Sequence, residues 1–173
     1  MSIEERKDQL IIPFRIRLGV TGQRNLKDVE NLSKTINQIL KEDIFELYDK
    51  NSKKIINSSR YTPITFSILT TLAEGAERSV VKEVLKFPYS IIEVVLPLLK
   101  EEYLQDFQSQ ESKEEFEKFL ALSRSPIILR KKSIREEFSE IEFEEARRQA
   151  YEDAGMYIVN HCDLLIVLWD IDI

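Results

Sequence analysis

Two glycine-containing runs in this sequence carry side chains that suit the binding of an anion. The first run is GVTGQR, in which Gly19, Thr21, Gly22, Gln23 and Arg24 stand at the end of a short apolar stretch. Glycine lets backbone N–H groups approach a ligand closely, and the threonine hydroxyl and arginine guanidinium add donors that fit a phosphate. The run lacks the third glycine of a dinucleotide-binding fingerprint and the lysine of a P-loop. It is therefore compatible both with a phosphate-binding loop and with a plain tight turn.

The second run is LAEGAER, which contains Glu74, Gly75, Glu77 and Arg78 and also follows an apolar stretch. An arginine in the first turn of a helix opposes the helix dipole. Arg24 and Arg78 both occupy such a place, so an anion bound between them would relieve the unfavourable charge. The alternative is that Arg78 pairs with Glu74 or points into solvent.

Three further positions follow predicted strand ends. Pro97 ends an apolar run, and Asp170 follows the last one. Tyr103, with Asp106 and Phe107, could form one wall of a pocket and stack on a base. Alternatively, Tyr103 and Phe107 lie four residues apart on the packed face of a helix.

Metal binding and thiol catalysis are disfavoured by the residue counts. The chain has one histidine and one cysteine, whereas a structural zinc site usually needs several such ligands. His161 and Cys162 are adjacent, so their side chains would not face each other on a helix. We expect no metal and no cofactor, and we assign no catalytic residue.

The elements that must position these residues alternate between short apolar runs and longer amphipathic ones, which is typical of an α/β domain. Five strands are predicted, at residues 14–20, 64–70, 91–96, 127–129 and 164–169. Helices are predicted at 26–47, from LAEGAER to about residue 87, over 100–123 with a capping box at Ser112 and Glu115, and at 142–161.

Right-handed crossovers between such strands predict a three-layer Rossmann-like fold. We expect a mostly parallel sheet of about five strands with helices on both faces, and a single domain over residues 1–173. Ligands of such sheets bind at the carboxyl ends of the strands, near the topological switch point. Both glycine-containing runs are predicted to lie at that edge.

The composition limits the function classes. The 173 residues are 43% hydrophobic, which excludes a disordered chain, and 25 Lys+Arg against 31 Asp+Glu give a net charge of −6. This acidic balance disfavours nucleic acid as a partner. A charged N-terminus, one cysteine and the lack of an apolar run of bilayer length predict a cytoplasmic protein that does not contact a membrane.

Four runs of the sequence resemble the SLOG superfamily of Rossmann-like domains, which includes DprA/Smf proteins, LOG phosphoribohydrolases and molybdenum-cofactor carrier-like proteins. These runs are LGVTGQRNL, LAEGAER, VVLPLLKEEYLQDFQSQESKEEF and AYEDAGMYIVNHCDLLIVLWD, and the similarity is to bacterial members. The resemblance implies a nucleotide-derived ligand, because several members sense nucleotide signals, some of them in anti-phage defence beside an effector domain. The implied ligand-binding residues are Gly19, Thr21, Gly22, Arg24, Gly75, Glu77 and Arg78.

The sequence departs from the superfamily pattern in two respects. Gln23 and Glu77 stand where related proteins usually have His and Asp. Related proteins also continue after the position of Asp170 into a glycine-rich, phosphate-cradling loop, which we expect this domain to lack. The general acid/base glutamate of LOG enzymes belongs to that loop.

The resemblance leads us to expect binding or sensing of a nucleotide or nucleotide-derived signal. One alternative is LOG-like hydrolysis of a nucleotide N-glycosidic bond, for which Glu74, Glu77 and Asp170 are the best-placed carboxylates. Another is single-stranded DNA binding as in DprA. A homo-oligomer and an effector domain or protein are compatible with the sequence as further partners.

Overall fold

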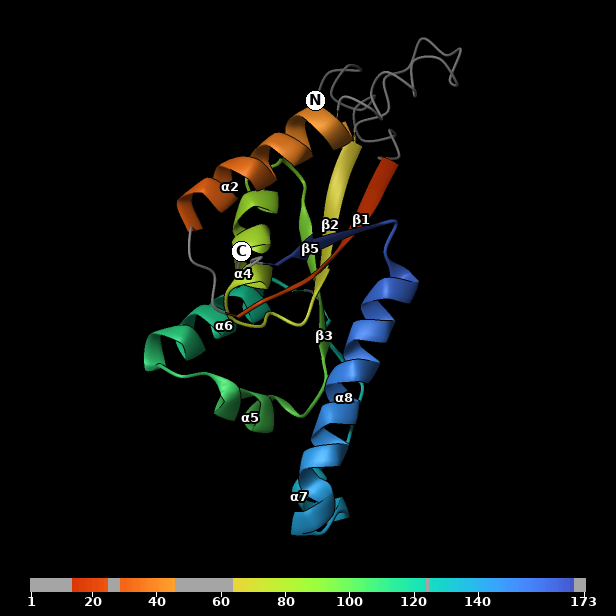
Figure 1. Ribbon diagram of the computed structural model, residues 1–173. Coiled ribbons are helices and arrows are strands. Elements are labelled where there is room, and N and C mark those ends of the chain that lie inside the picture. Colours follow the sequence, from red (N-terminus) through yellow and green to blue (C-terminus); the bar gives the residue numbers. More distant parts are fainter. Residues whose placement is uncertain (1–13, 25–28, 46–63, 124, 170–173) are drawn as a thin grey trace, which may run out of the picture.

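The computed structural model describes residues 14–24, 29–45, 64–123 and 125–169 (Figure 1). The described strands are β1 (Phe14–Gly22), β2 (Ile64–Thr70), β3 (Ile91–Leu96), β4 (Ile127–Ile128) and β5 (Leu164–Leu168). They form one sheet in the order β4-β3-β2-β1-β5, and every pair of neighbours is parallel. The predicted Rossmann-like α/β fold is confirmed, with a sheet that is parallel throughout.

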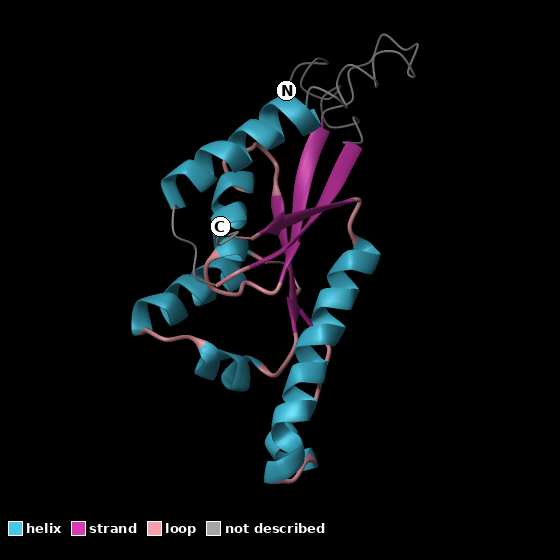
Figure 2. Cartoon of the chain, viewed as in Figure 1, coloured by secondary structure: helices cyan, strands magenta, loops and turns pink. Residues whose placement is uncertain are grey.

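Helices cover both faces of this sheet (Figure 2). They are α2 (Val29–Gln38), which continues as the π-helix η1 (Ile39–Phe45), α4 (Ala76–Val84), α5 (Lys100–Tyr103), the 3₁₀ helix η2 (Leu104–Asp106), α6 (Gln110–Leu122), α7 (Ile134–Glu137) and α8 (Glu140–His161). Helices α2 and α4 pack against each other on one face, and α8 crosses the opposite face against β1 and β3 (Figure 1). None of these helices combines the length and apolar composition that a bilayer span requires.

Strand β1 shows why the sheet forms where it does. Its residues Ile16, Leu18 and Val20 are fully buried, as the period of two in the sequence predicts. The strand runs two residues further than predicted, to Gly22, because Thr21 and Gly22 pair with β5. The predicted turn glycines Gly19 and Gly22 are therefore strand residues.

The predicted helix over residues 100–123 is interrupted. Phe107 has extended backbone, with φ −88° and ψ 131°, and its ring packs edge-to-face on Tyr103 with 5.1 Å between centroids. Burying this ring requires the chain to leave the helix, so α5 and η2 end before α6 begins.

The predicted capping box at Ser112 and Glu115 is wrong. The N-cap of α6 is Ser109, whose side chain accepts a hydrogen bond from the backbone N–H of Ser112 at 3.1 Å. A capping box is present at the start of α8, where Ser139 and Glu142 satisfy each other's backbone N–H groups.

The order of the strands places the topological switch between β1 and β5. The chain adds β2, β3 and β4 in turn on one side of β1, and α8 then carries it back to β5 on the other side. In open parallel sheets, a ligand binds outside the carboxyl ends of the strands at such a point. In this sheet, the edge at which a ligand is expected lies beyond Gly22 of β1 and Leu168 of β5.

Candidate functional site

The two predicted loops lie against each other at this edge. The carbonyl of Gln23 accepts a hydrogen bond from the N–H of Ala76 at 3.1 Å. Gly75 has φ +80°, and a Cβ atom there would overlap the backbone carbonyl of Arg24. A Cβ atom at Gly22 would lie 2.7 Å from the Cβ of Ala76. These glycines allow the two loops to pack closely.

A cavity of about 250 Å³ lies between α8 and the carboxyl ends of β1 and β2. Four residues of the predicted site line it, namely Thr21, Gly22, Arg24 and Glu77. Further lining comes from the β2–α4 connection, from α8 and from β5, through Thr71, Ala73, Tyr151, Gly155, Val159 and Leu165. The cavity therefore joins both predicted loops to the switch point of the sheet.

Glu77 organises the loop that follows β2. Its carboxylate accepts hydrogen bonds from the Thr70 hydroxyl at 2.6 Å, the Thr71 N–H at 2.8 Å and the Ala73 N–H at 3.3 Å. The Thr71 hydroxyl also donates to it at 2.9 Å and accepts from the hydroxyl of Tyr103 at 3.2 Å. Burial raises the pKa of Glu77, and the hydrogen bonds from the two threonines oppose this shift.

The Arg78 side chain makes hydrogen bonds and an ion pair with other residues of the protein. Its side chain is only 3% exposed, and its Nε donates to the Leu72 carbonyl at 2.9 Å. Its Nη1 donates to the carbonyl and hydroxyl oxygens of Ser112, both at 2.8 Å, and pairs with Glu115 at 3.2 Å. The guanidinium lies over the ring of Phe107 at 4.5 Å. It connects the β2–α4 loop to α6, so the expectation that Arg24 and Arg78 hold one anion between them does not fit this geometry.

The second arginine near Arg24 is Arg147 of α8, not Arg78. Arg24 and Arg147 both contact the carboxylate of Asp106. The Arg24 side chain is 43% exposed and lies 4.0 Å from Asp106, whereas Arg147 contacts the other carboxylate oxygen and is 20% exposed. Burial, together with the charges of Glu144 and Glu74, raises the pKa of Asp106, and Arg24 opposes this shift. Burial and the like charge of Arg24 lower the pKa of Arg147.

Arg147 was missed by sequence reasoning. The signal that could have found it is the spacing of Arg147, Tyr151 and Gly155 on α8, because residues four apart share one face of a helix. Two of these three residues line the cavity.

The other described residues of the predicted site lie outside the cavity lining. A Cβ atom at Gly19 would lie 2.8 Å from the Cys162 Sγ, so this glycine allows β1 to pack closely against the end of α8. Pro97 and Tyr103 are buried, and Tyr103 packs against Phe107 as the alternative predicts, although Phe107 lies beyond the end of the helix. Glu74 accepts hydrogen bonds from the Ser112 hydroxyl and, at 3.3 Å, from the N–H of Gln108. Asp170 lies outside the described residues.

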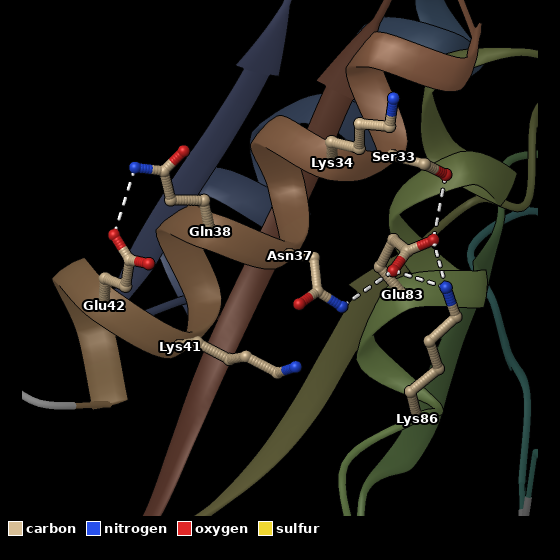
Figure 3. A pocket seen from close by; sticks show the side chains of 8 residues that line it. All are labelled: Ser33, Lys34, Asn37, Gln38, Lys41, Glu42, Glu83 and Lys86. Atoms are coloured by element: carbon tan, nitrogen blue, oxygen red, sulfur yellow. Dashed lines mark hydrogen bonds and ion pairs between the residues drawn. The ribbon is translucent and has the colours of Figure 1, made fainter.

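A second cavity, of about 440 Å³, lies between α2 and α4 (Figure 3). Its central group is Glu83, which is 3% exposed and accepts from Ser33 at 2.8 Å, Asn37 at 3.1 Å and Lys86 at 2.6 Å. Burial raises the pKa of Glu83, but these three partners outweigh it and lower the pKa. Because the polar groups satisfy each other, we assign this cluster to the packing of α2 on α4.

Comparisons of the chain with models of known protein families, with curated proteins and with solved structures gave no match. The fold alone therefore defines the class of this protein. It is an α/β domain with a parallel five-stranded, Rossmann-like sheet. Within the described ranges, no three His, Cys, Asp or Glu side chains are grouped so that they could hold a metal ion.

Proposed function

We propose that this domain binds a nucleotide or a nucleotide-derived signal in the cavity at the carboxyl ends of β1 and β2. The observation that supports this proposal is that Thr21, Gly22 and Arg24 from one predicted loop and Glu77 from the other line the same cavity. This cavity lies beside the switch point of the sheet, which is where Rossmann-like folds bind their ligands.

The size of the cavity favours a mononucleotide. At about 250 Å³ it is slightly smaller than most small-molecule sites, which have volumes of roughly 300–1,000 Å³. This volume suits a base and sugar whose phosphate extends to the rim, and it is too small for a dinucleotide. Ile158, Val159 and Leu165 form an apolar part of the lining, and Thr21 and Thr71 supply hydroxyl groups.

Arg24 is the residue best placed to hold the phosphate. Its pairing with Asp106 at 4.0 Å is long and partly exposed, and such ion pairs contribute only about 0–1 kcal/mol. A phosphate offers stronger charge-assisted hydrogen bonds and can displace this contact. Arg147, held by Asp106, adds a second positive charge nearby.

Calorimetric titration with AMP, GMP, CMP and UMP tests the proposal. Arg24→Ala is expected to weaken binding by roughly 1.5–3 kcal/mol, the range for a hydrogen bond to a charged group. Arg148→Ala is the matched control, because Arg148 is an exposed arginine of α8 that pairs with Glu145 and Glu152. Absence of binding by the wild-type protein, or equal affinity of wild type and Arg24→Ala, would contradict the proposal.

A second candidate function is hydrolysis of the N-glycosidic bond of the bound nucleotide. Of the described residues that line the cavity, Glu77 alone carries a carboxyl group, which is a type of group that serves as a general acid, and burial raises its pKa. The bond from the anomeric carbon to the base would break as Glu77 gives its proton to the base, water would add to that carbon, and the proton that the water loses would restore Glu77. Release of free base from the four nucleoside monophosphates, lost in Glu77→Gln, tests this candidate, and no release by the wild-type protein excludes it.

A further inference from the structure

Gly155 lies in the middle of α8 at a position where packing does not demand a glycine. Among the described residues, a Cβ atom at this position would meet no heavy atom within 4 Å, whereas one at Gly19, Gly22 or Gly75 would meet several. Glycine in a helix interior lowers helix stability relative to alanine. Gly155 lines the cavity, so the space that its missing side chain leaves is open to a ligand.

Tyr151, one helical turn before Gly155, lines the same cavity. Its hydroxyl oxygen is buried and has no hydrogen-bond partner among the described residues. A buried polar group without a partner is unfavourable, and nearly all such groups in folded proteins are satisfied. A ligand in the cavity can supply the missing partner.

The residues at intervals of four along α8 differ in character from one turn to the next. Arg147 lies one turn before Tyr151 and, with Arg24, provides the positive charge around Asp106. Val159 lies one turn after Gly155 and lines the apolar end of the cavity. Within the cavity, α8 therefore presents a hydroxyl at Tyr151, open backbone at Gly155 and an apolar side chain at Val159 in that order, which suits the sugar and base of a nucleotide.

We propose that α8 forms the base-binding subsite, with the base lying against the helix backbone at Gly155 and the Tyr151 hydroxyl hydrogen-bonded to the nucleoside. This inference rests on the proposed nucleotide-binding function. Gly155 sets the width of the subsite, because any side chain there would occupy the space of the base.

The test compares the tightest-binding nucleoside monophosphate with ribose 5-phosphate, which has the sugar and phosphate but no base. Gly155→Val is expected to weaken binding of the nucleotide at least tenfold and to leave binding of ribose 5-phosphate, followed by NMR titration, unchanged. Tyr151→Phe is expected to weaken nucleotide binding about 3- to 10-fold, the range for one hydrogen bond. Asn160→Leu, at an exposed position of α8 outside the cavity, is the control and should bind as wild type does.

Stability measurements separate a binding role from a structural one. Gly155→Ala should raise the melting temperature by roughly 2–4 °C while it weakens nucleotide binding, and Tyr151→Phe should not lower the melting temperature. Unchanged nucleotide affinity in Gly155→Val, or equal loss of ribose 5-phosphate binding, overturns the base subsite. If Arg24→Ala weakens nucleotide binding but Gly155→Val does not, the subsite alone is overturned. If the wild-type protein binds no nucleotide, the proposed function itself is overturned.

Discussion

The backbone of Gly75 lies directly against the carbonyl group of Arg24. The φ of Gly75 is +80°, and a Cβ atom at this position would overlap that carbonyl. Because of this contact, the connection that follows β1 and the connection that follows β2 pack together. Arg24 and Glu77, which are far apart in sequence, consequently line one cavity.

Gly75→Ala is expected to destabilise the domain by roughly 2–4 kcal/mol, because it combines a strained left-handed backbone with steric overlap. Gly155→Ala should instead stabilise it by about 1 kcal/mol, the difference in helix propensity between the two residues. Urea unfolding followed by circular dichroism measures both. Similar effects of the two substitutions would show that the contact between Gly75 and Arg24 does not hold the loops together.

Arg78→Lys should cost at least about 2 kcal/mol even though the charge is retained. Lysine cannot bond the carbonyls of Leu72 and Ser112 together, and a buried carbonyl that loses its partner costs about 1–3 kcal/mol. Arg148→Ala provides the comparison, since an exposed substitution of this kind changes stability by only about 0.5 kcal/mol or less. An Arg78→Lys variant as stable as wild type would refute the connecting role assigned to this side chain.

Glu77 is expected to make the domain less stable as the pH rises. Its pKa in the folded protein is raised from the ordinary value of 4.5, so its contribution is fully present below pH 4.5 and is lost as the pH rises through the folded-state pKa. Glu77→Gln removes this titration, and its stability relative to wild type should therefore improve as the pH rises. Urea unfolding between pH 4 and 8 gives the difference at each pH. A difference that is independent of pH would contradict the raised pKa.

Glu83 should show the opposite dependence on pH. Its pKa is lowered from 4.5, so its contribution is present above pH 4.5 and is lost as the pH falls through the folded-state pKa. Glu83→Gln is expected to cost about 1.5–3 kcal/mol at pH 7, where the charged hydrogen bonds are intact, and less in acid.

Glu42→Gln is the matched control for Glu83→Gln. Glu42 lines the same cavity, but it is exposed and hydrogen-bonded to Gln38 at 3.0 Å. Its replacement should change stability by only about 0.5 kcal/mol or less. Comparable losses in the two variants at pH 7 would argue against Glu83 as the group that joins α2 to α4.

The sequence alone determined the class of fold and the edge at which the predicted loops meet. The bounds of β2 and β3, Ile64–Thr70 and Ile91–Leu96, agree with those predicted. Apolar periodicity reflects local backbone geometry, and the handedness of crossovers then restricts the sheet to parallel pairing. For the same reason, the carboxyl ends of β1 and β2 could be placed side by side before any contact was known.

Only the tertiary structure decided which arginines lie near the cavity. Arg24 and Arg78 look equivalent in sequence, yet Arg78 is bonded to Ser112 of α6 and Arg24 shares Asp106 with Arg147 of α8. These partners are separated by long stretches of chain, and whether they meet depends on how the helices pack. The break at Phe107 has the same origin, because a ring that gains burial in the core outweighs the helical preference of its neighbours. Local sequence patterns specify helices and strands. The partners of a long polar side chain depend instead on which helices and strands pack around it.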